Sequence, residues 1–190
     1  MNLGFKERFD DGSKTYFPAL IWDSLIPEDD VEALLEMGRY CQMYADRYGH
    51  PWDMVPVDEP RDAKIHTLRT DKSDRWKPGM RIHFKCGNRY EPGGQFQFAP
   101  VCRCHAIEKV TMFSDGARLF LYVGGRALIG DEMEQFARND GFRDSDHMAS
   151  WFFPETANVD ETDMAKVHLK LIHWTAHLYT PDTAQIYQPC

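Results

Sequence analysis

The sequence predicts an α+β fold in which a small mixed β-barrel carries flanking helices and a helical insertion near the N-terminus. Several short stretches alternate between apolar and polar residues, with turn signals between them, as in small barrels. A few other stretches place apolar residues at helical spacing. The length of 190 residues suits one domain, expected over 1–180, with an insertion at about 17–60 and a C-terminal tail at 181–190.

The expected strands are short and are bounded by turn-forming residues. Residues 65–69 alternate between two faces, which is the period of a strand. Clusters rich in Gly, Pro and Asp indicate turns at 10–13, 77–79 and 91–94. Strands are expected at 2–9, 64–69, 80–85, 101–113, 118–123 and 167–178.

The expected helices lie in the insertion and before the last strand. Pro27 suits a first helical turn, and apolar residues such as Val31 and Leu35 recur at helical spacing, so a helix is expected at about 28–48. Two short helices are expected around 133–137 and 148–152. Between them, Gly141 is the expected left-handed residue of a helix stop.

Charge is distributed unevenly along the chain. The net charge is -8, yet residues 61–90 hold nine Lys or Arg and three Asp, so this stretch carries +6 and the remainder carries -14. A local basic patch on an acidic body suits an anionic ligand of limited size, although an ordinary solvated face explains it equally well. The chain shows neither an N-terminal apolar leader nor a membrane-spanning apolar run, so a cytoplasmic location without a membrane partner is expected.

The cysteines give little sign of a metal site. Five cysteines in a chain of this kind predict no disulfide framework. Cys102 and Cys104, with His105, invite a zinc interpretation, but the spacing differs from the usual Cys-x-x-Cys. Packing of two small side chains on one strand face is the favoured interpretation, and neither a metal nor a cofactor is expected.

Lys64, Thr67 and Arg69 form the polar constellation with the clearest chemical potential. Thr67 and Arg69 share a strand face, and a bend before the strand would let Lys64 join them. A lysine and a hydroxyl within reach of each other can act as base and nucleophile if burial favours the neutral amine. On spacing alone, a solvent-facing strand is the more common outcome.

Two stretches carry a family resemblance. Lys64-x-x-Thr67-x-Arg69 is followed by Trp-Lys-Pro-Gly-Met at 76–80, and later segments read Phe-Ala-Arg-Asn-Asp-Gly-Phe at 136–142 and His-Met-Ala-Ser-Trp-Phe at 147–152. These segments resemble the ASCH domain, a family of the PUA-like β-barrels, and 5–9 is similar to its first strand. The resemblance covers about residues 1–16 and 61–175 and is interrupted by the insertion.

The resemblance implies an amidohydrolase of the N4-acetylcytidine type, because some bacterial ASCH proteins remove the acyl group from that nucleoside. The family's catalytic lysine and threonine match Lys64 and Thr67, and its glutamate falls at Asp140. Lys64 would act as base, and Thr67 would be the nucleophile or would orient water. Asp140 would orient Lys64 or carry a proton to the leaving amine. Arg69 would hold the oxyanion or the pyrimidine carbonyl.

Other functions stay open beside this one. A non-catalytic module that binds RNA or a modified nucleotide is the first alternative, and an RNase on the same barrel is the second. Asp62 stands where the family has glycine, and Asp140 is one methylene shorter than the family's glutamate. The expected partner is a modified nucleoside or a short RNA.

Three further residues are candidates for substrate binding. Trp76 could stack on a base, although packing beneath the turn at 77–79 is the favoured interpretation. Phe5 lies where the resemblance puts the cleft wall, and core packing is its alternative. His66 is also a candidate, with a satisfied core or surface histidine as its alternative. His173 and His177 are interpreted as barrel residues.

Overall fold

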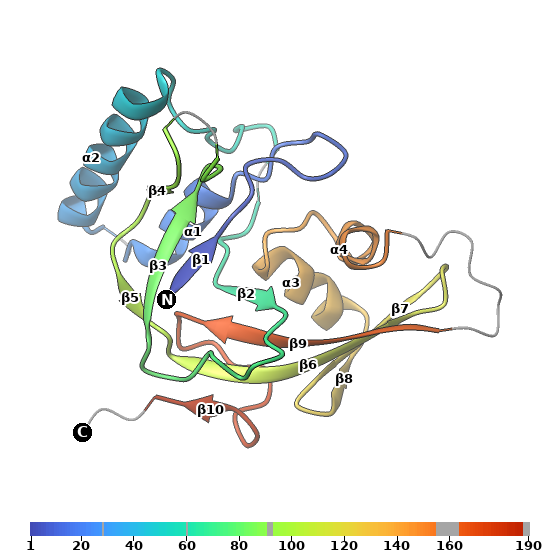
Figure 1. Cartoon of the computed structure of the whole chain (residues 1–190). Helices are drawn as coiled ribbons and strands as arrows, with labels where there is room; N and C mark the ends of the chain where they lie inside the picture. The colour runs from blue at the N-terminus through green and yellow to red at the C-terminus, as the bar shows by residue number, and fades with distance from the viewer. Residues whose placement is uncertain (28, 60, 91–92, 155–163, 188–190) are drawn as a thin grey trace. The chain divides into compact units, whose positions relative to one another are not determined.

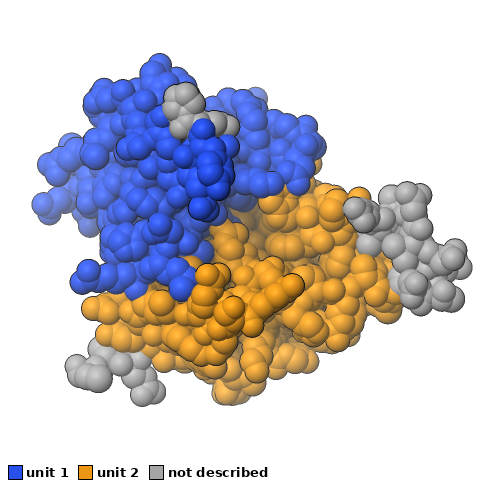
Figure 2. Space-filling model, in the orientation of Figure 1, with its two compact units in different colours: residues 1–64, 81–102 blue, residues 65–80, 103–190 orange. Residues whose placement is uncertain are grey.

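The computed structural model describes residues 1–27, 29–59, 61–90, 93–154 and 164–187 and has an α+β architecture, as predicted (Figure 1). The chain divides into two compact units, and each is built from two separate stretches (Figure 2). Unit 1 contains 1–64 and 81–102, and unit 2 contains 65–80 and 103–190.

Unit 1 combines a small sheet with two helices. Its elements are β1 (Asn2–Gly4), α1 (Phe17–Leu25), α2 (Val31–Tyr48), β3 (Arg81–Cys86) and β4 (Phe96–Gln97), with β5 (Cys102–Arg103) at its boundary. β1 runs parallel to β3 and β4 runs antiparallel to it, while β5 also pairs with β3. A ring cluster forms the core, because the ring of Phe5 lies 5.9–6.1 Å from those of Phe17, Phe84 and Phe98.

Unit 2 is built on an antiparallel sheet with strand order β2-β9-β6-β7-β8, and β10 pairs with β6. Its strands are β2 (His66–Arg69), β6 (Ala106–Ser114), β7 (Leu119–Val123), β8 (Arg126–Leu128), β9 (Ala165–His173) and β10 (Gln185–Ile186). Two helices, α3 (Asp131–Asn139) and α4 (Ser145–Phe152), lie over one face of the sheet (Figure 1). Among the described strands, β2 and β8 are open edges, so this sheet does not close on itself.

The two faces of the unit 2 sheet differ in burial. Along β6, Glu108, Val110 and Met112 are buried, whereas Lys109 is exposed and Thr111 is half-buried. Successive side chains of a strand point to opposite faces, so this alternation separates an inner face from an outer face. The inner face carries Glu108, Val110 and Met112 of β6 with Leu169, Leu171 and His173 of β9. The outer face carries Lys109, Thr111 and Phe113 of β6 with Lys166, His168 and Lys170 of β9.

The predicted helix of the insertion is confirmed, with one addition. Helix α2 begins after Asp30, whose side chain accepts a hydrogen bond from the Ala33 N–H at 3.0 Å, and Gly49 follows its end. Sequence periodicity did not predict α1. Its residues from Phe17 to Trp22 are all buried, so the segment is apolar on every side and lacks the 3.6-residue pattern of an amphipathic helix.

Several predicted strands are shorter or broken. The stretch expected at 101–113 divides into β5 and β6, because Cys104 leaves the ladder to exchange hydrogen bonds with Gly79 and Met80. The first strand ends at Gly4, and the closing strand ends at His173.

Part of the expected C-terminal tail is structured, since β10 pairs with Ala106 and Ile107. Residues 188–190 of that tail, the predicted helix start at Glu28 and the predicted turn residues Glu91 and Pro92 lie outside the described residues.

Candidate functional site

The end of α3 is joined to the start of β2. The Ile65 N–H donates to the Asn139 carbonyl at 3.0 Å, which fixes the last turn of the helix against the strand that carries Thr67 and Arg69. Thr67 is 2% exposed and Asp140 is 3% exposed. The backbone therefore brings the helix stop and the predicted Thr-x-Arg strand into one region of unit 2.

Gly141 sets the position of Asp140. Its φ of 86° is a left-handed conformation that favours glycine, as the sequence predicted. The Gly141 N–H donates to the Arg138 carbonyl at 2.8 Å, and the Phe142 N–H donates to the Ala137 carbonyl at 3.0 Å. This pair of bonds is a Schellman motif, which makes Asp140 the C-cap residue of α3.

A hydrogen-bond chain with a fixed direction runs from α3 to Tyr179. Arginine can only donate, so the contact at 3.0 Å between Arg138 Nη2 and Gln135 Oε1 orients the Gln135 amide. Gln135 Nε2 then donates to Asn139 Oδ1 at 2.9 Å. This leaves Asn139 Nδ2 to donate to the Tyr179 hydroxyl oxygen at 2.9 Å.

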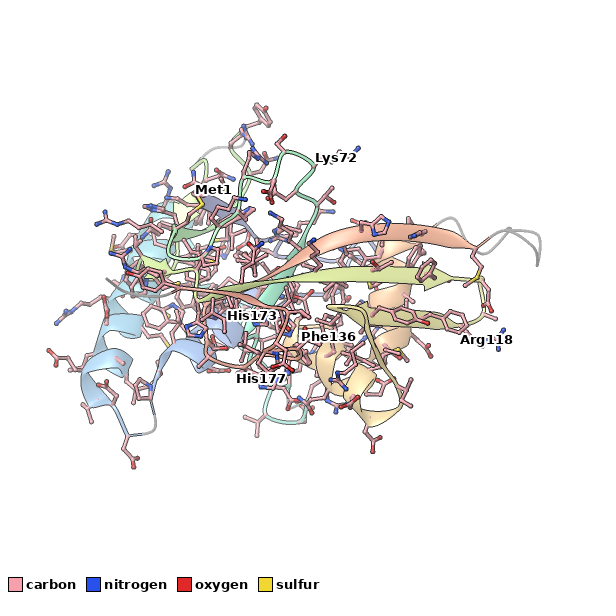
Figure 3. All side chains as sticks on the ribbon, turned by 90° about the horizontal axis from the view of Figure 1, so that it is seen from below. Met1, Lys72, Arg118, Phe136, His173 and His177 are labelled. Atoms are coloured by element: carbon pink, nitrogen blue, oxygen red, sulfur yellow. The ribbon has the colours of Figure 1, made fainter. Side chains whose placement is uncertain are left out.

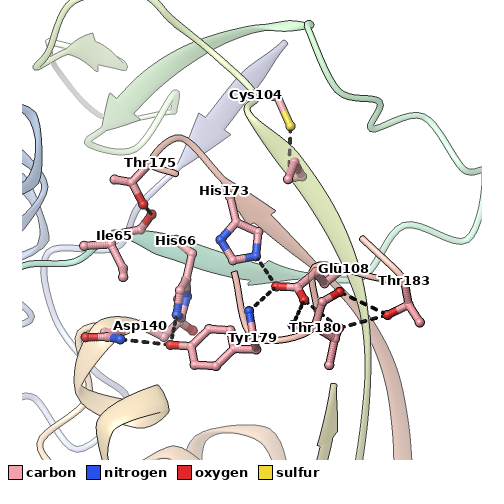
Figure 4. Close-up of polar contacts among 12 residues, drawn as sticks. Ile65, His66, Cys104, Glu108, Asp140, His173, Thr175, Tyr179, Thr180 and Thr183 are labelled. Atoms are coloured by element: carbon pink, nitrogen blue, oxygen red, sulfur yellow. Dashed lines mark hydrogen bonds and ion pairs between the residues drawn. The ribbon is translucent and has the colours of Figure 1, made fainter. Parts of the chain in front are cut away.

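The same chain reaches His66. The Tyr179 oxygen accepts from Asn139 and lies 2.9 Å from His66 Nε2 (Figure 4). Donation of the Tyr179 proton to Nε2 would place the proton of neutral His66 on Nδ1. That nitrogen lies 3.7 Å from Asp140 Oδ1, so the buried imidazole directs a positive dipole at the carboxylate.

Tyr179 stays protonated over a wide pH range. Burial raises the pKa of its hydroxyl well above the ordinary value. Donation by Asn139 opposes this change, and the carboxylates of Asp140 and Glu108 add to it. The ring packs against Phe136 at 4.9 Å and His177 at 4.8 Å. The Tyr179 hydroxyl therefore keeps its proton at neutral pH.

A second buried polar group lies on the same inner face. Glu108 Oε2 lies 2.8 Å from His173 Nε2 (Figure 4), and both side chains are fully buried. Burial alone would raise the pKa of Glu108. Hydrogen bonds from His173, the Thr180 hydroxyl and the Tyr179 N–H outweigh it and lower that pKa to about 2. Glu108 is therefore a carboxylate at neutral pH and holds the segment at 179–180 against the sheet.

The remaining predicted residues lie in different surroundings. Burial lowers the pKa of the Arg69 guanidinium, and the nearby Asp140 carboxylate acts in the opposite direction. Trp76 is 4% exposed, and its N–H donates to Asp71 at 2.8 Å, which agrees with the packing interpretation. Phe5 belongs to the ring cluster of unit 1. Asp62 is exposed and does not adopt the positive φ that a glycine would allow.

Lys64 is the last residue of unit 1, and its side chain is almost fully buried, at 1% exposure. Its N–H donates to the Leu20 carbonyl at 2.9 Å. Its ammonium lies 4.7 Å from the ring centroid of Phe17 and 6.0 Å from that of Phe5. The ring cluster thus provides a partly aromatic environment for this lysine.

Cysteine and metal chemistry are limited in the described structure. Cys104 is buried, its thiol donates to the Ala106 carbonyl at 3.5 Å, and burial raises its pKa to about 12. Within the described residues, no group of three His, Cys, Asp or Glu side chains is arranged to hold a metal ion.

Sequence reasoning missed Glu108, Asn139 and Tyr179 as parts of this site, and it assigned His173 to the barrel alone. The sequence could have identified Glu108, because it occupies an inward position of β6 between the apolar residues Ala106 and Val110. An acid at such a position needs strong partners. Tyr179 had no local signal, since its partners come from segments far away in the sequence.

The chain matches no family model, no curated protein and no solved structure. In the described part of the chain, no helix combines the length and the apolar character needed to cross a bilayer.

Proposed function

We propose that this chain is an amidohydrolase of the ASCH type that removes the acyl group from an N4-acylated cytosine nucleoside, on a PUA-like barrel. One observation carries the proposal: Lys64, Thr67 and Asp140, the three residues of the motif, are all buried, at 1%, 2% and 3% exposure. Lysine and aspartate are almost never this buried unless they are paired or have a task.

Chain connectivity supports a joint role for Lys64 and Thr67. The two residues are three positions apart, so even a fully extended backbone keeps their Cα atoms within about 11 Å.

The proposed reaction is hydrolysis of the exocyclic amide. The Thr67 hydroxyl attacks the acyl carbonyl, and its proton passes to Lys64. Asp140 relays that proton from Lys64 to the leaving amine, and Arg69 holds the oxyanion. Water then cleaves the acyl-threonine ester, which gives a cytosine nucleoside and a carboxylic acid. His66 would assist electrostatically, since its Nδ1 lies 3.7 Å from Asp140 Oδ1.

The test is to follow cytidine formation from N4-acetylcytidine with the wild type, Lys64→Ala, Thr67→Ala and a matched control. Thr183→Ala suits as the control, because Thr183 is exposed and bonds to Thr180. We expect turnover by the wild type and the control, and a loss of at least about a hundredfold in the other two.

Absence of turnover by the wild type would reject this substrate. Equal turnover by all four proteins would reject the residue roles instead. Thermal unfolding of each variant checks that a lost rate is not a lost fold.

A further inference from the structure

A groove of about 530 Å³ lies on the outer face of the unit 2 sheet. Among its lining residues, Lys72 comes from the loop after β2, Lys109 from β6, and Lys166, His168 and Lys170 from β9. Asp71 is the one acid in this lining. A cluster of four lysines around one groove is unusual on a chain whose net charge is -8.

Lys170 is the neutralised member of this cluster. Its ammonium lies 3.1 Å from Asp71 Oδ2 and also pairs with Asp74. Burial opposes ionisation of Asp71, but the Trp76 and Arg75 N–H groups and Lys170 outweigh it and lower the pKa of Asp71 to about 2. Both partners are thus charged at neutral pH, and the pair anchors the loop after β2 to β9.

Lys72, Lys109 and Lys166 differ from Lys170. No described carboxylate lies within salt-bridge distance of any of them, and Lys72, Lys109 and Lys166 are exposed. Lys109 stands directly opposite Lys170 across the strands. Since Lys170 is paired with Asp71 and Asp74, the three exposed lysines are the charges on this face that an anionic ligand could meet.

Aromatic rings continue this face beyond the groove. Phe113 lies directly opposite Phe120 on β7, and its ring is 5.9 Å from that of Tyr122. The Lys166 ammonium lies 5.0 Å from the Phe113 centroid, and the Arg118 guanidinium lies 5.5 Å from that of Phe120. Figure 3 shows Arg118 at the end of the β7 ribbon. Cations and half-buried rings therefore share one sheet face.

We infer that this outer face binds a single strand of nucleic acid, with phosphates on Lys72, Lys109 and Lys166 and bases on Phe113 and Tyr122. Lysines that track a backbone beside aromatic platforms are the arrangement by which proteins hold single strands. A duplex would hide its bases from the rings. β6 and β7 are neighbours, about 4.8 Å apart, so one strand can reach lysines and rings together.

The cross-strand register links this face to the proposed catalytic strand. Arg69 stands opposite Lys170, and Lys170 stands opposite Lys109, so a row of cations crosses β2, β9 and β6. If the proposed function holds, its substrate is an acylated cytosine within a strand that lies along this row. Strand binding itself does not depend on the catalytic proposal.

The experiment measures fluorescence anisotropy of a labelled oligouridylate of about ten nucleotides against KCl concentration. Three phosphate contacts predict a slope of about -2 for log K against log salt, because each contributes about -0.7 on single strands. Lys109→Gln and Lys166→Gln should each reduce that slope by about 0.7. Arg39→Gln removes the same charge from an exposed position of α2 and should leave the slope unchanged.

Two further measurements test the ring contacts and the size of the ligand separately. Tyr122→Leu should weaken binding at least about fivefold with no change in slope, whereas Tyr122→Phe should bind as the wild type does. Uridine monophosphate should compete poorly.

The inference is overturned if the decamer does not bind at low salt, or if the lysine variants keep the wild-type slope. Competition by the mononucleotide as strong as that by the decamer would also overturn it, since this would indicate a small-anion site. The assay reads binding without chemistry, so its failure and failure of the amidohydrolase proposal are separate results.

Discussion

Adjacent residues on the two faces of the unit 2 sheet differ in burial and in how their charges are satisfied. Glu108 points inward, where His173, Thr180 and the chain at Tyr179 satisfy its carboxylate. Lys109, the next residue, points outward and is exposed. The inner face buries its polar groups against one another, whereas the outer face presents exposed lysines beside the ion-paired Lys170. The period of two along a strand thus separates structural polar groups from groups available to a ligand.

The largest expected difference between the faces is in stability. Glu108→Gln leaves the buried His173 without its carboxylate and should lower the free energy of unfolding by about 3 kcal/mol. Lys109→Gln should change it by less than about 0.5 kcal/mol, as for most surface positions. Urea unfolding of both variants beside the wild type measures this contrast. Equal losses would show that the faces are not distinct.

Acid should reduce the contribution of Glu108. The pKa of Glu108 is lowered from 4.5 to about 2 in the folded protein, so its ionised form favours folding above about pH 4.5. That stabilisation is lost as the pH falls toward 2. The difference in unfolding free energy between wild type and Glu108→Gln should therefore shrink on going from about pH 7 to about pH 3. A constant difference would contradict the assigned cause.

Removal of one hydroxyl tests the directional chain. Tyr179→Phe takes away the donor to His66 Nε2 and leaves Asn139 without its acceptor, for an expected loss of about 1–2 kcal/mol. The ¹⁵N chemical shifts of His66 should report the Nδ1–H tautomer in the wild type and lose that preference in the variant. Tyr122→Phe removes a hydroxyl from the outer face and serves as the control. An Nε2–H tautomer in the wild type would refute the chain.

A smaller effect is expected at the helix stop. Gly141→Ala forces a side chain into a φ of 86° and should cost about 1 kcal/mol. The mobility of Asp140 should increase with it, because the Schellman bonds hold that residue. Gly38→Ala, in the middle of α2, is the opposite control and should stabilise the helix slightly. Thermal unfolding should show a lower stability for Gly141→Ala and a slightly higher stability for Gly38→Ala.

Local patterns were sufficient for most elements of the fold. The helix at Val31–Tyr48, the stop at Gly141 and the strand at His66–Arg69 all depend on near neighbours, and the structure has them close to where they were predicted. The helix at Phe17–Leu25 was not predicted, because burial on every side removes the 3.6-residue hydrophobic pattern of an amphipathic helix. The predicted closed barrel is not confirmed, because the described strands of unit 2 form an open sheet and closure depends on pairings between distant segments.

The sequence predicted the candidate site only in part, because several of its contacts join segments that are distant in the chain. Spacing singled out Thr67 and Arg69 on one strand, and the family resemblance added Asp140 beside the helix stop. The tautomer of His66 depends on Tyr179, which is 113 residues away in the chain. The outer groove depends on the register of β6 with β9, which sequence alone does not fix.

The most direct test of the catalytic proposal compares Thr67→Ser with Thr67→Val in cytidine formation from N4-acetylcytidine. Serine keeps the hydroxyl, whereas valine keeps the shape and removes the proposed nucleophile. We expect Thr67→Ser to retain turnover and Thr67→Val to lose at least about a hundredfold in rate. Equal rates for the two variants would contradict it.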